Sequence, residues 1–274
     1  MERSESIGSR MAAGASWMVL FKLLDRGMGV VSVIVLARLL VPADFGLIAL
    51  SVSLIALLEV LGAFGLETAL IQQANARRAH YDAVWTFNVL LGLATGLVAA
   101  ALAASAASFY GDPRVALVML VLGAARAIQG FENVGVVAFR KEMQFDREFR
   151  FLLAKRLAPT LLVTIPLAFV LRDYWALLIG SFAGACIGVC LSYAMHPFRP
   201  RPSLAGLSGL MQFSKWLFVA NVMDVVHSRL VDMILGRSAG TSAVGMLTVA
   251  RELARLPREL VAPVHRRVLV PFQA

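Results

Sequence analysis

The sequence predicts an all-α polytopic membrane protein with about eight transmembrane helices. Of its 274 residues, 59% are hydrophobic and only 16% are charged, whereas soluble domains contain about 25% charged residues. The mean hydropathy is +0.76. The apolar residues form runs long enough to cross a bilayer, which takes about 20 residues per helix. This composition excludes a soluble globular domain and a disordered chain.

Eight apolar runs define the expected spanning segments. A helix satisfies its own backbone hydrogen bonds, so it is the expected form in lipid, and the sequence has no alternating strand pattern of the kind that builds a barrel. The turn-forming stretches 41–44, 110–113 and 196–202 separate several of the runs. The expected segments are 12–40, 43–71, 82–109, 114–138, 150–171, 174–196, 213–236 and 242–270.

Individual segments carry further signals. The first is interrupted by Lys22, Asp25 and Arg26 and continues to Leu40, so it is not a cleavable signal peptide. Glycines four residues apart in the third and sixth segments predict close helix packing. These glycines are Gly92 and Gly96, then Gly180, Gly184 and Gly188. Two prolines predict a kink in the fifth segment, namely Pro159 and Pro166.

The loop charges predict the orientation of the chain. One set of loop ends carries 12 basic residues and the other carries 4. The positive-inside rule therefore places the N-terminus and the more basic loops in the cytoplasm. The more basic set is Arg3, Arg10, Arg77, Arg78, Arg140, Lys141, Arg147, Arg150, Arg199, Arg201, Arg266 and Arg267. The other set is Arg38, Arg114, Arg172 and Arg237.

An internal repeat is indicated by a shift of 199 residues. The matched positions are Trp17 with Trp216, Asp25 with Asp224, 36–38 with 235–237, and Gly46 with Gly245. They lie at equivalent places in the expected helices, and repeats of this kind build many transporters. Because six helices precede the second copy, that copy would have the same orientation as the first. Chance similarity between apolar helices is the alternative.

The repeat predicts a two-lobed organisation. Residues 1–198 would form a complete six-helix N-terminal lobe. Residues 199–274 would form the incomplete start of a C-terminal lobe, a parallel repeat represented by its first two helices. We interpret the sequence as a C-terminally truncated form of a longer carrier.

Ionisable groups inside spanning segments usually face a polar interior. Cations on such faces would attract an anion such as a phosphate or diphosphate, and the candidates for substrate binding in a cationic lumen are Lys22, Arg26, Arg251, Arg255 and Arg258. The candidates for polar lumen or coupling groups are Asp25, Asn221, Asp224, His227 and Asp232. Alternatively, each cation only pairs with a nearby carboxylate, such as Lys22 with Asp25, or Arg251 with Glu252 or Glu259.

Other classes of function have little support. The sequence has no nucleophile motif and no Walker sequence, so no enzymatic activity or cofactor is expected. Cys186 and Cys190 have no His or further thiol beside them, so no metal site is expected. The net charge is +9, but the basic residues fall between apolar runs, as topology requires, and nucleic-acid binding is not expected.

Four short motifs carry a family resemblance. They are 36–47 (LARLLVPADFGL), 64–72 (FGLETALIQ), 84–88 (VWTFN) and 140–145 (RKEMQF). In this order and spacing they resemble bacterial polysaccharide and O-antigen flippases of the multidrug/oligosaccharidyl-lipid/polysaccharide exporter superfamily. The resemblance implies a multi-pass carrier in the bacterial inner membrane that moves undecaprenyl-diphosphate-linked oligosaccharides by alternating access. It also implies membrane lipid, polysaccharide polymerase and glycosyltransferases as partners.

Two other functions stay open. A drug or cation antiporter of the same superfamily would favour a net acidic cavity, whereas we interpret the inner faces of the expected helices as net basic. A truncated membrane scaffold that does not transport is the third possibility.

Overall fold

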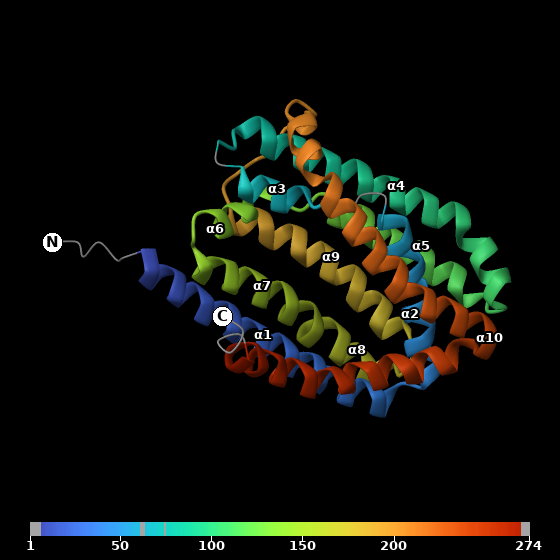
Figure 1. Cartoon of the computed structure of the whole chain (residues 1–274). Coiled ribbons are helices and arrows are strands. Elements are labelled where there is room, and N and C mark those ends of the chain that lie inside the picture. The colour runs from blue at the N-terminus through green and yellow to red at the C-terminus, as the bar shows by residue number, and fades with distance from the viewer. Residues whose placement is uncertain (1–6, 61–63, 74, 270–274) are drawn as a thin grey trace.

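The computed structural model describes residues 7–60, 64–73 and 75–269. Within these ranges, the side chains of 7–15, 208, 212–217, 219–221, 224–228, 253 and 255–269 lie outside the description. The described backbone is helical and contains no strand. The helices lie side by side in one elongated bundle (Figure 1). An all-α architecture is therefore confirmed over the described part.

The helices follow the order of the apolar runs, with several differences in their bounds. They are α1 (Ile7–Leu39), α2 (Pro42–Glu59), α3 (Leu66–Gln72), α4 (Arg78–Tyr110), α5 (Arg114–Gln129), η2 (Val134–Val136), α6 (Val137–Lys141), α7 (Phe145–Pro159), η3 (Thr160–Thr164), α8 (Ile165–Leu171), α9 (Trp175–Met195) and α10 (Leu207–Leu269). α10 has two arms that meet at Gly240, where the glycine takes φ 81° and ψ 176°. In Figure 1 the second arm, in red, turns back along α1.

Two expected spans are broken in the structure. The segment predicted at 43–71 ends as α2 at Glu59, and α3 begins after Gly65, which has a left-handed φ of 61°. The segment predicted at 114–138 is bent by 64° between α5 and the 134–141 helices. Asn133 holds this bend, because its side chain accepts a hydrogen bond from the Gly135 amide and donates to the Phe198 carbonyl, at 2.9 and 2.8 Å. Hydropathy alone predicts neither the break before α3 nor the bend after α5.

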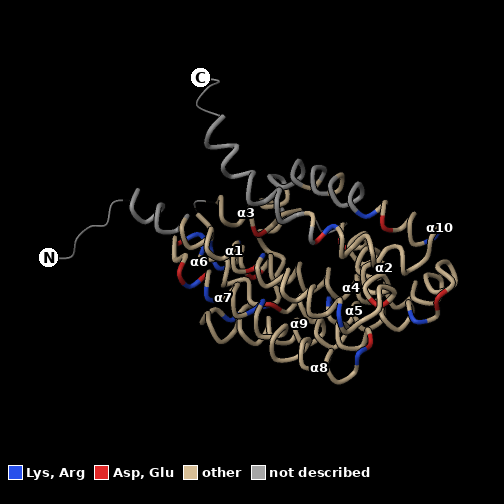
Figure 2. The backbone as a smooth tube through the Cα atoms, turned by 90° about the horizontal axis from the view of Figure 1, so that it is seen from below, with Lys and Arg blue, Asp and Glu red and all other residues tan. Residues whose placement is uncertain are grey.

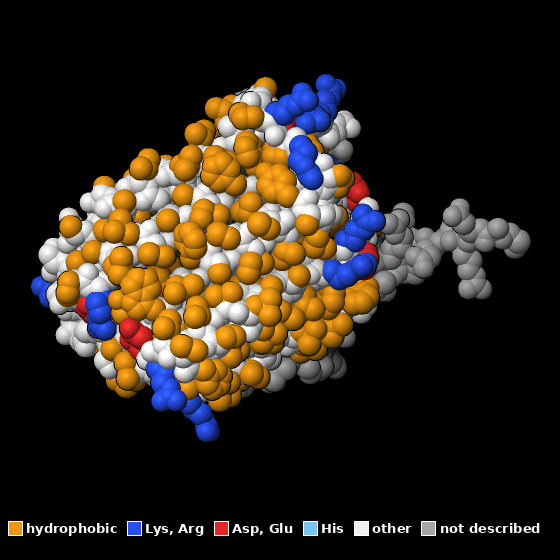
Figure 3. All heavy atoms as spheres, turned by 180° about the vertical axis from the view of Figure 1, so that it is seen from behind, with side chains coloured by type: hydrophobic (Ala, Val, Ile, Leu, Met, Phe, Trp, Pro, Cys, Tyr) orange, Lys and Arg blue, Asp and Glu red, His pale blue; other side chains and the backbone are white. Residues whose placement is uncertain are grey.

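The expected count of eight spans is not confirmed over the described residues. Among the described residues, four helical runs are long and apolar enough to cross a membrane, namely α2, α4, the continuous run from α7 through α8, and α9. The bent α5–α6 pair would be a fifth. α1, which carries Lys22, Asp25 and Arg26, is not among these runs. Figure 3 nevertheless shows a broad apolar face between charged rims, as expected for a membrane protein.

Small residues set the closest helix contacts. A methyl group at Gly96 would lie 2.9 Å from the Gly123 carbonyl oxygen, so α4 and α5 pack with little space between their backbones. In α9, Gly180 faces Thr164 in η3, the single π-helical turn that lies between Pro159 and Pro166. The predicted packing role of both glycine rows is confirmed.

A still closer approach joins α2 to the second arm of α10. A methyl group at Gly46 would lie 1.7 Å from the Thr241 carbonyl oxygen, and one at Gly245 would lie 1.7 Å from the Pro42 carbonyl oxygen. Pro42 and Thr241 are 199 residues apart, as are Gly46 and Gly245. The contact is therefore the same from either side, as expected at a two-fold axis between repeated units.

Candidate functional site

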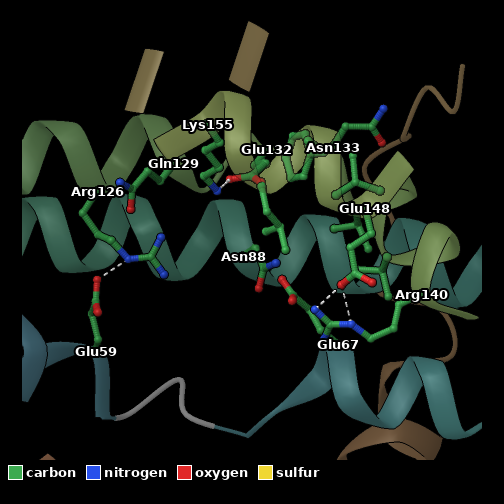
Figure 4. Close-up of a pocket in the computed structure, with 15 residues that line it drawn as sticks. Glu59, Glu67, Asn88, Arg126, Gln129, Glu132, Asn133, Arg140, Glu148 and Lys155 are labelled. Carbon is green, nitrogen blue, oxygen red and sulfur yellow. Dashed lines mark hydrogen bonds and ion pairs between the residues drawn. The ribbon is translucent and has the colours of Figure 1, made fainter. Parts of the chain in front are cut away.

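A cavity of about 460 Å³, here named the charged chamber, lies inside the bundle. α2, α3, α4, α5, α6 and α7 all contribute to its walls (Figure 4). Its polar and charged lining residues are Glu59, Glu67, Asn88, Arg126, Gln129, Glu132, Asn133, Arg140, Glu148 and Lys155. Ten polar side chains in one cavity of an apolar bundle are costly, so they indicate a binding function.

Each cation of the charged chamber pairs with a carboxylate from another element. Arg126 in α5 pairs with Glu59 at the end of α2. Lys155 in α7 lies 2.5 Å from Glu132, which precedes η2. These pairs, drawn as dashed lines in Figure 4, fix the cations toward the interior of the cavity.

The third pair joins α6 to α7. The Arg140 Nε atom donates to the buried Glu148 carboxylate at 2.7 Å. Glu67 projects toward the same cavity, and within the described residues its carboxylate has no hydrogen bond or ion pair. The chamber thus contains four carboxylates and three cations.

A larger cavity of about 690 Å³ adjoins the charged chamber and is here named the central cavity. Both cavities are lined by Gln129, Leu152 and Lys155, so they are neighbours. The central cavity also receives residues from α1, α9 and the second arm of α10. It therefore contacts both the first and the last described helices.

Two ion pairs tie α1 to its neighbours beside the central cavity. The Arg156 Nε atom of α7 lies 2.9 Å from the Asp25 carboxylate. The Arg26 guanidinium donates to the Glu252 carboxylate at 2.9 Å and to the Glu252 carbonyl at 3.1 Å. Figure 2 shows charged residues within the bundle as well as at the helix ends.

The structure brings some of the predicted site residues together. Asp25 lines the central cavity, and Arg26 binds Glu252, which also lines it. Lys22 is exposed, and it makes no ion pair within the described residues, so its suggested pairing with Asp25 is wrong.

The remaining candidates divide into two groups. Within α10, Arg251 pairs with the buried Asp232. The Asp232 carboxylate also accepts a hydrogen bond from the Ser53 hydroxyl at 3.4 Å. The side chains of the other candidates lie outside the described part of the structure; these are Asn221, Asp224, His227, Arg255 and Arg258. Their placement in a lumen stays a prediction.

Sequence reasoning missed two cations that line the cavities. Lys155 lines both cavities, and Arg156 lines the central cavity. Adjacent cations inside the expected 150–171 span were a signal, since charges in spans usually face a polar interior. The chamber amides Asn88 and Gln129 had no such signal, because amides in apolar helices have no spacing rule.

The chain resembles known proteins over most of its length. Residues 35–274 match the family described as "Polysaccharide biosynthesis protein". The chain is 22% identical over 274 residues to the lipopolysaccharide biosynthesis protein WzxC of Escherichia coli, covering 97% of this chain and 55% of that protein. It is 24% identical over 258 residues to the succinoglycan biosynthesis transport protein ExoT of Rhizobium meliloti, covering 93% and 52%.

A further relative is the amylovoran biosynthesis protein AmsL of Erwinia amylovora, 25% identical over 219 residues, covering 74% of this chain and 53% of that protein. The chain spans about half the length of the curated relatives it matches. No solved structure matches it.

Proposed function

The chain belongs to the polysaccharide biosynthesis protein family, and on that premise we propose that it is a flippase, or the N-terminal part of one. Its substrate would be undecaprenyl-diphosphate-linked oligosaccharide, moved across the bacterial inner membrane for surface polysaccharide synthesis. The N-terminus would lie in the cytoplasm together with the 12 basic loop residues. Membrane lipid, polysaccharide polymerase and glycosyltransferases are the proposed partners.

One observation carries the proposal: the charged chamber and the central cavity adjoin inside a bundle with an apolar surface. Such an interior would hold a polar sugar headgroup while the lipid tail stays in the bilayer. A diphosphate would bind by competing with a carboxylate for its cation, because phosphate oxygens accept two parallel bonds from a guanidinium. Arg126 and Arg156 are placed for this exchange.

The two-lobed organisation is part of the proposal. Residues 1–198 would form one lobe, and 199–274 would begin the second. The matching contacts at Gly46 and Gly245 support a two-fold relation between them. Rocking of the lobes about such an axis would open the central cavity to each side in turn.

The test is export in the host of the gene, with the chromosomal gene replaced by variants. Lys155→Gln combined with Glu132→Gln removes one pair without leaving a lone buried charge. We expect surface polysaccharide to fall at least about tenfold and the lipid-linked precursor to accumulate, at unchanged protein level. Arg150→Gln is the control, because Arg150 is exposed and pairs with Asp146 outside both cavities. Export by the double variant equal to the control would refute the proposed site.

A cation antiporter is the second candidate, because the chamber has four carboxylates and three cations. In that case Glu67→Gln would abolish resistance to toxic cations and leave surface polysaccharide unchanged. Loss of polysaccharide without a change in resistance would exclude it.

A further inference from the structure

A separate polar cavity, here named the headgroup pocket, has a volume of about 620 Å³. It lies between the start of α4, the end of α6 and the segment that follows α9. It shares no lining residue with the charged chamber or the central cavity. The proposed transport path therefore does not account for it.

The ends of two spanning helices fix the depth of the headgroup pocket. Arg78 is the first residue of α4, and His196 directly follows the last residue of α9, and both helices are long enough to span. The rings of Tyr81 and Phe198 meet in the pocket wall at a tilt of 52°, with their centroids 5.6 Å apart. Tyrosine and other amphipathic rings concentrate at the membrane interface, so the pocket lies at the level of lipid headgroups.

The cations of the headgroup pocket are held by backbone carbonyl groups. The Lys141 ammonium donates to the Gln73 carbonyl at 2.7 Å and to the Leu70 carbonyl at 3.4 Å. The Arg78 guanidinium donates to the Arg199 carbonyl at 2.8 Å. A carbonyl oxygen fixes the position of a cation without cancelling its charge. Lys141 has no ion pair among the described residues, whereas Arg78 also pairs with Asp82 one turn along α4.

The nearby carboxylates also accept hydrogen bonds from other groups. Asp82 accepts from the Arg201 amide at 2.9 Å and lies 3.6 Å from the Arg78 Nε atom. Glu142, which also lines the pocket, accepts from the Gln144 side chain at 2.9 Å. The adjoining segment after α9 adds Arg201 to the positive charge of this end.

We propose that the headgroup pocket binds the phosphate group of an anionic membrane lipid. Positioned cations bind phosphate oxygens by charge-assisted hydrogen bonds, and basic pockets between membrane helices at the cytoplasmic side take anionic headgroups. Free phosphate has the same chemistry, but the position at the helix ends favours a lipid. The inference does not depend on which substrate the chain carries.

The test is native mass spectrometry of the full chain released from detergent with added phosphatidylglycerol. Diacylglycerol with the same acyl chains is the phosphate-free comparison. We expect saturable phosphatidylglycerol binding that Arg78→Gln weakens about tenfold, as loss of one charge-assisted bond predicts. The Arg78 side chain is 55% exposed, so the variant should fold. Arg150→Gln is the matched control at the same end of the bundle.

Three outcomes decide the proposal. Equal phosphatidylglycerol binding by Arg78→Gln and Arg150→Gln would overturn it, and so would equal binding of diacylglycerol and phosphatidylglycerol by the unaltered chain. Inorganic phosphate at millimolar concentration is then added to the lipid complex. Failure to displace the lipid assigns the site to a headgroup, whereas displacement that Arg78→Gln abolishes would overturn the lipid assignment in favour of soluble phosphate. Lys141→Gln provides a second variant if Arg78→Gln does not fold.

Discussion

Charged residues within the bundle act mainly by pairing across helices. The pair between Arg26 in α1 and Glu252 in α10 is partly buried, with side chains 19% and 25% exposed. Removing one partner takes a compensating charge away from the other in a poorly hydrated site. We expect Arg26→Gln and Glu252→Gln each to lower the free energy of unfolding by about 1–3 kcal/mol.

A double-mutant cycle measures this pair in detergent-solubilised chain. The exchanged variant, Arg26→Glu with Glu252→Arg, should recover part of the lost thermal stability. Additive effects of the two single changes would show that the residues are not coupled. The Arg26 variants also test the proposed lumen, because loss of export in the exchanged variant despite recovered stability would indicate a role beyond pairing.

A pH effect is expected at Asp112, in the loop between α4 and α5. The Arg114 side chain donates hydrogen bonds to its carboxylate, at 2.8 Å for the shortest, and lowers the pKa of Asp112 below its usual 3.8. The unfolded chain then takes up this proton at higher pH than the folded chain, so the pair stabilises the fold above pH 3.8 and this contribution is lost as pH falls through the lowered pKa.

The comparison is the thermal unfolding midpoint of Asp112→Asn and unaltered chain between pH 6 and pH 3. The variant should be less stable at pH 6, and the difference should shrink toward pH 3. A difference that stays constant with pH would show that the ionised carboxylate is not responsible.

At the residue scale, sequence reasoning identified charges but not their partners. Asp25 and Arg26 were found because they interrupt an apolar run, yet they pair with Arg156 and Glu252, far away in the chain. Helix periodicity relates residues three or four positions apart, such as Lys22 and Asp25. Only the packing of the helices decides which distant partner is within reach.

At the element scale, the crossing of α2 and α10 depends on two glycines. A methyl group at Gly46 or Gly245 has no room, because a backbone carbonyl lies 1.7 Å from its ideal position. We expect Gly46→Ala and Gly245→Ala each to force the helices apart and to cost about 1–3 kcal/mol, as overpacking does.

Gly27 in α1 is the matched control, because a methyl group there would meet nothing within 4 Å. Gly27→Ala should be neutral or stabilise the helix by up to about 1 kcal/mol. Thermal unfolding in detergent compares the variants. Equal stability of Gly46→Ala and Gly27→Ala would show that the two helices do not cross as closely as described.

The helix order was predictable, whereas the breaks were not. Long apolar runs place α1, α4 and α9 to within a few residues. The break before α3 depends on the left-handed Gly65, and the bend after α5 depends on Asn133 binding the segment after α9. Such breaks leave the apolar composition unchanged, so a hydropathy pattern predicts one continuous helix across each break.

At the scale of the whole molecule, the exposed apolar surface requires a membrane. Leu97, Leu162 and Val170 are 72–78% exposed, which would be costly in water. Figure 3 shows similar side chains over one whole face, with charged residues confined to its rims. A bilayer that covers the apolar face leaves the two charged rims in the two aqueous phases.

The same arrangement predicts which rim faces the cytoplasm. The segment after α9 lies at the more basic rim, and the end of α4 lies at the opposite rim, because α4 begins at the basic Arg77–Arg78 stretch and crosses the bundle. The positive-inside rule then places position 205 in the cytoplasm and position 108 outside.

Cysteine introduced as Ser108→Cys should react with a membrane-impermeant maleimide in intact spheroplasts, whereas Ala205→Cys should react only after lysis. Both changes are made with Cys186→Ala and Cys190→Ala, so that only one thiol is present. The opposite labelling pattern would invert the proposed orientation. It would also move the headgroup pocket to the outer leaflet, because His196 and residue 205 belong to the same segment.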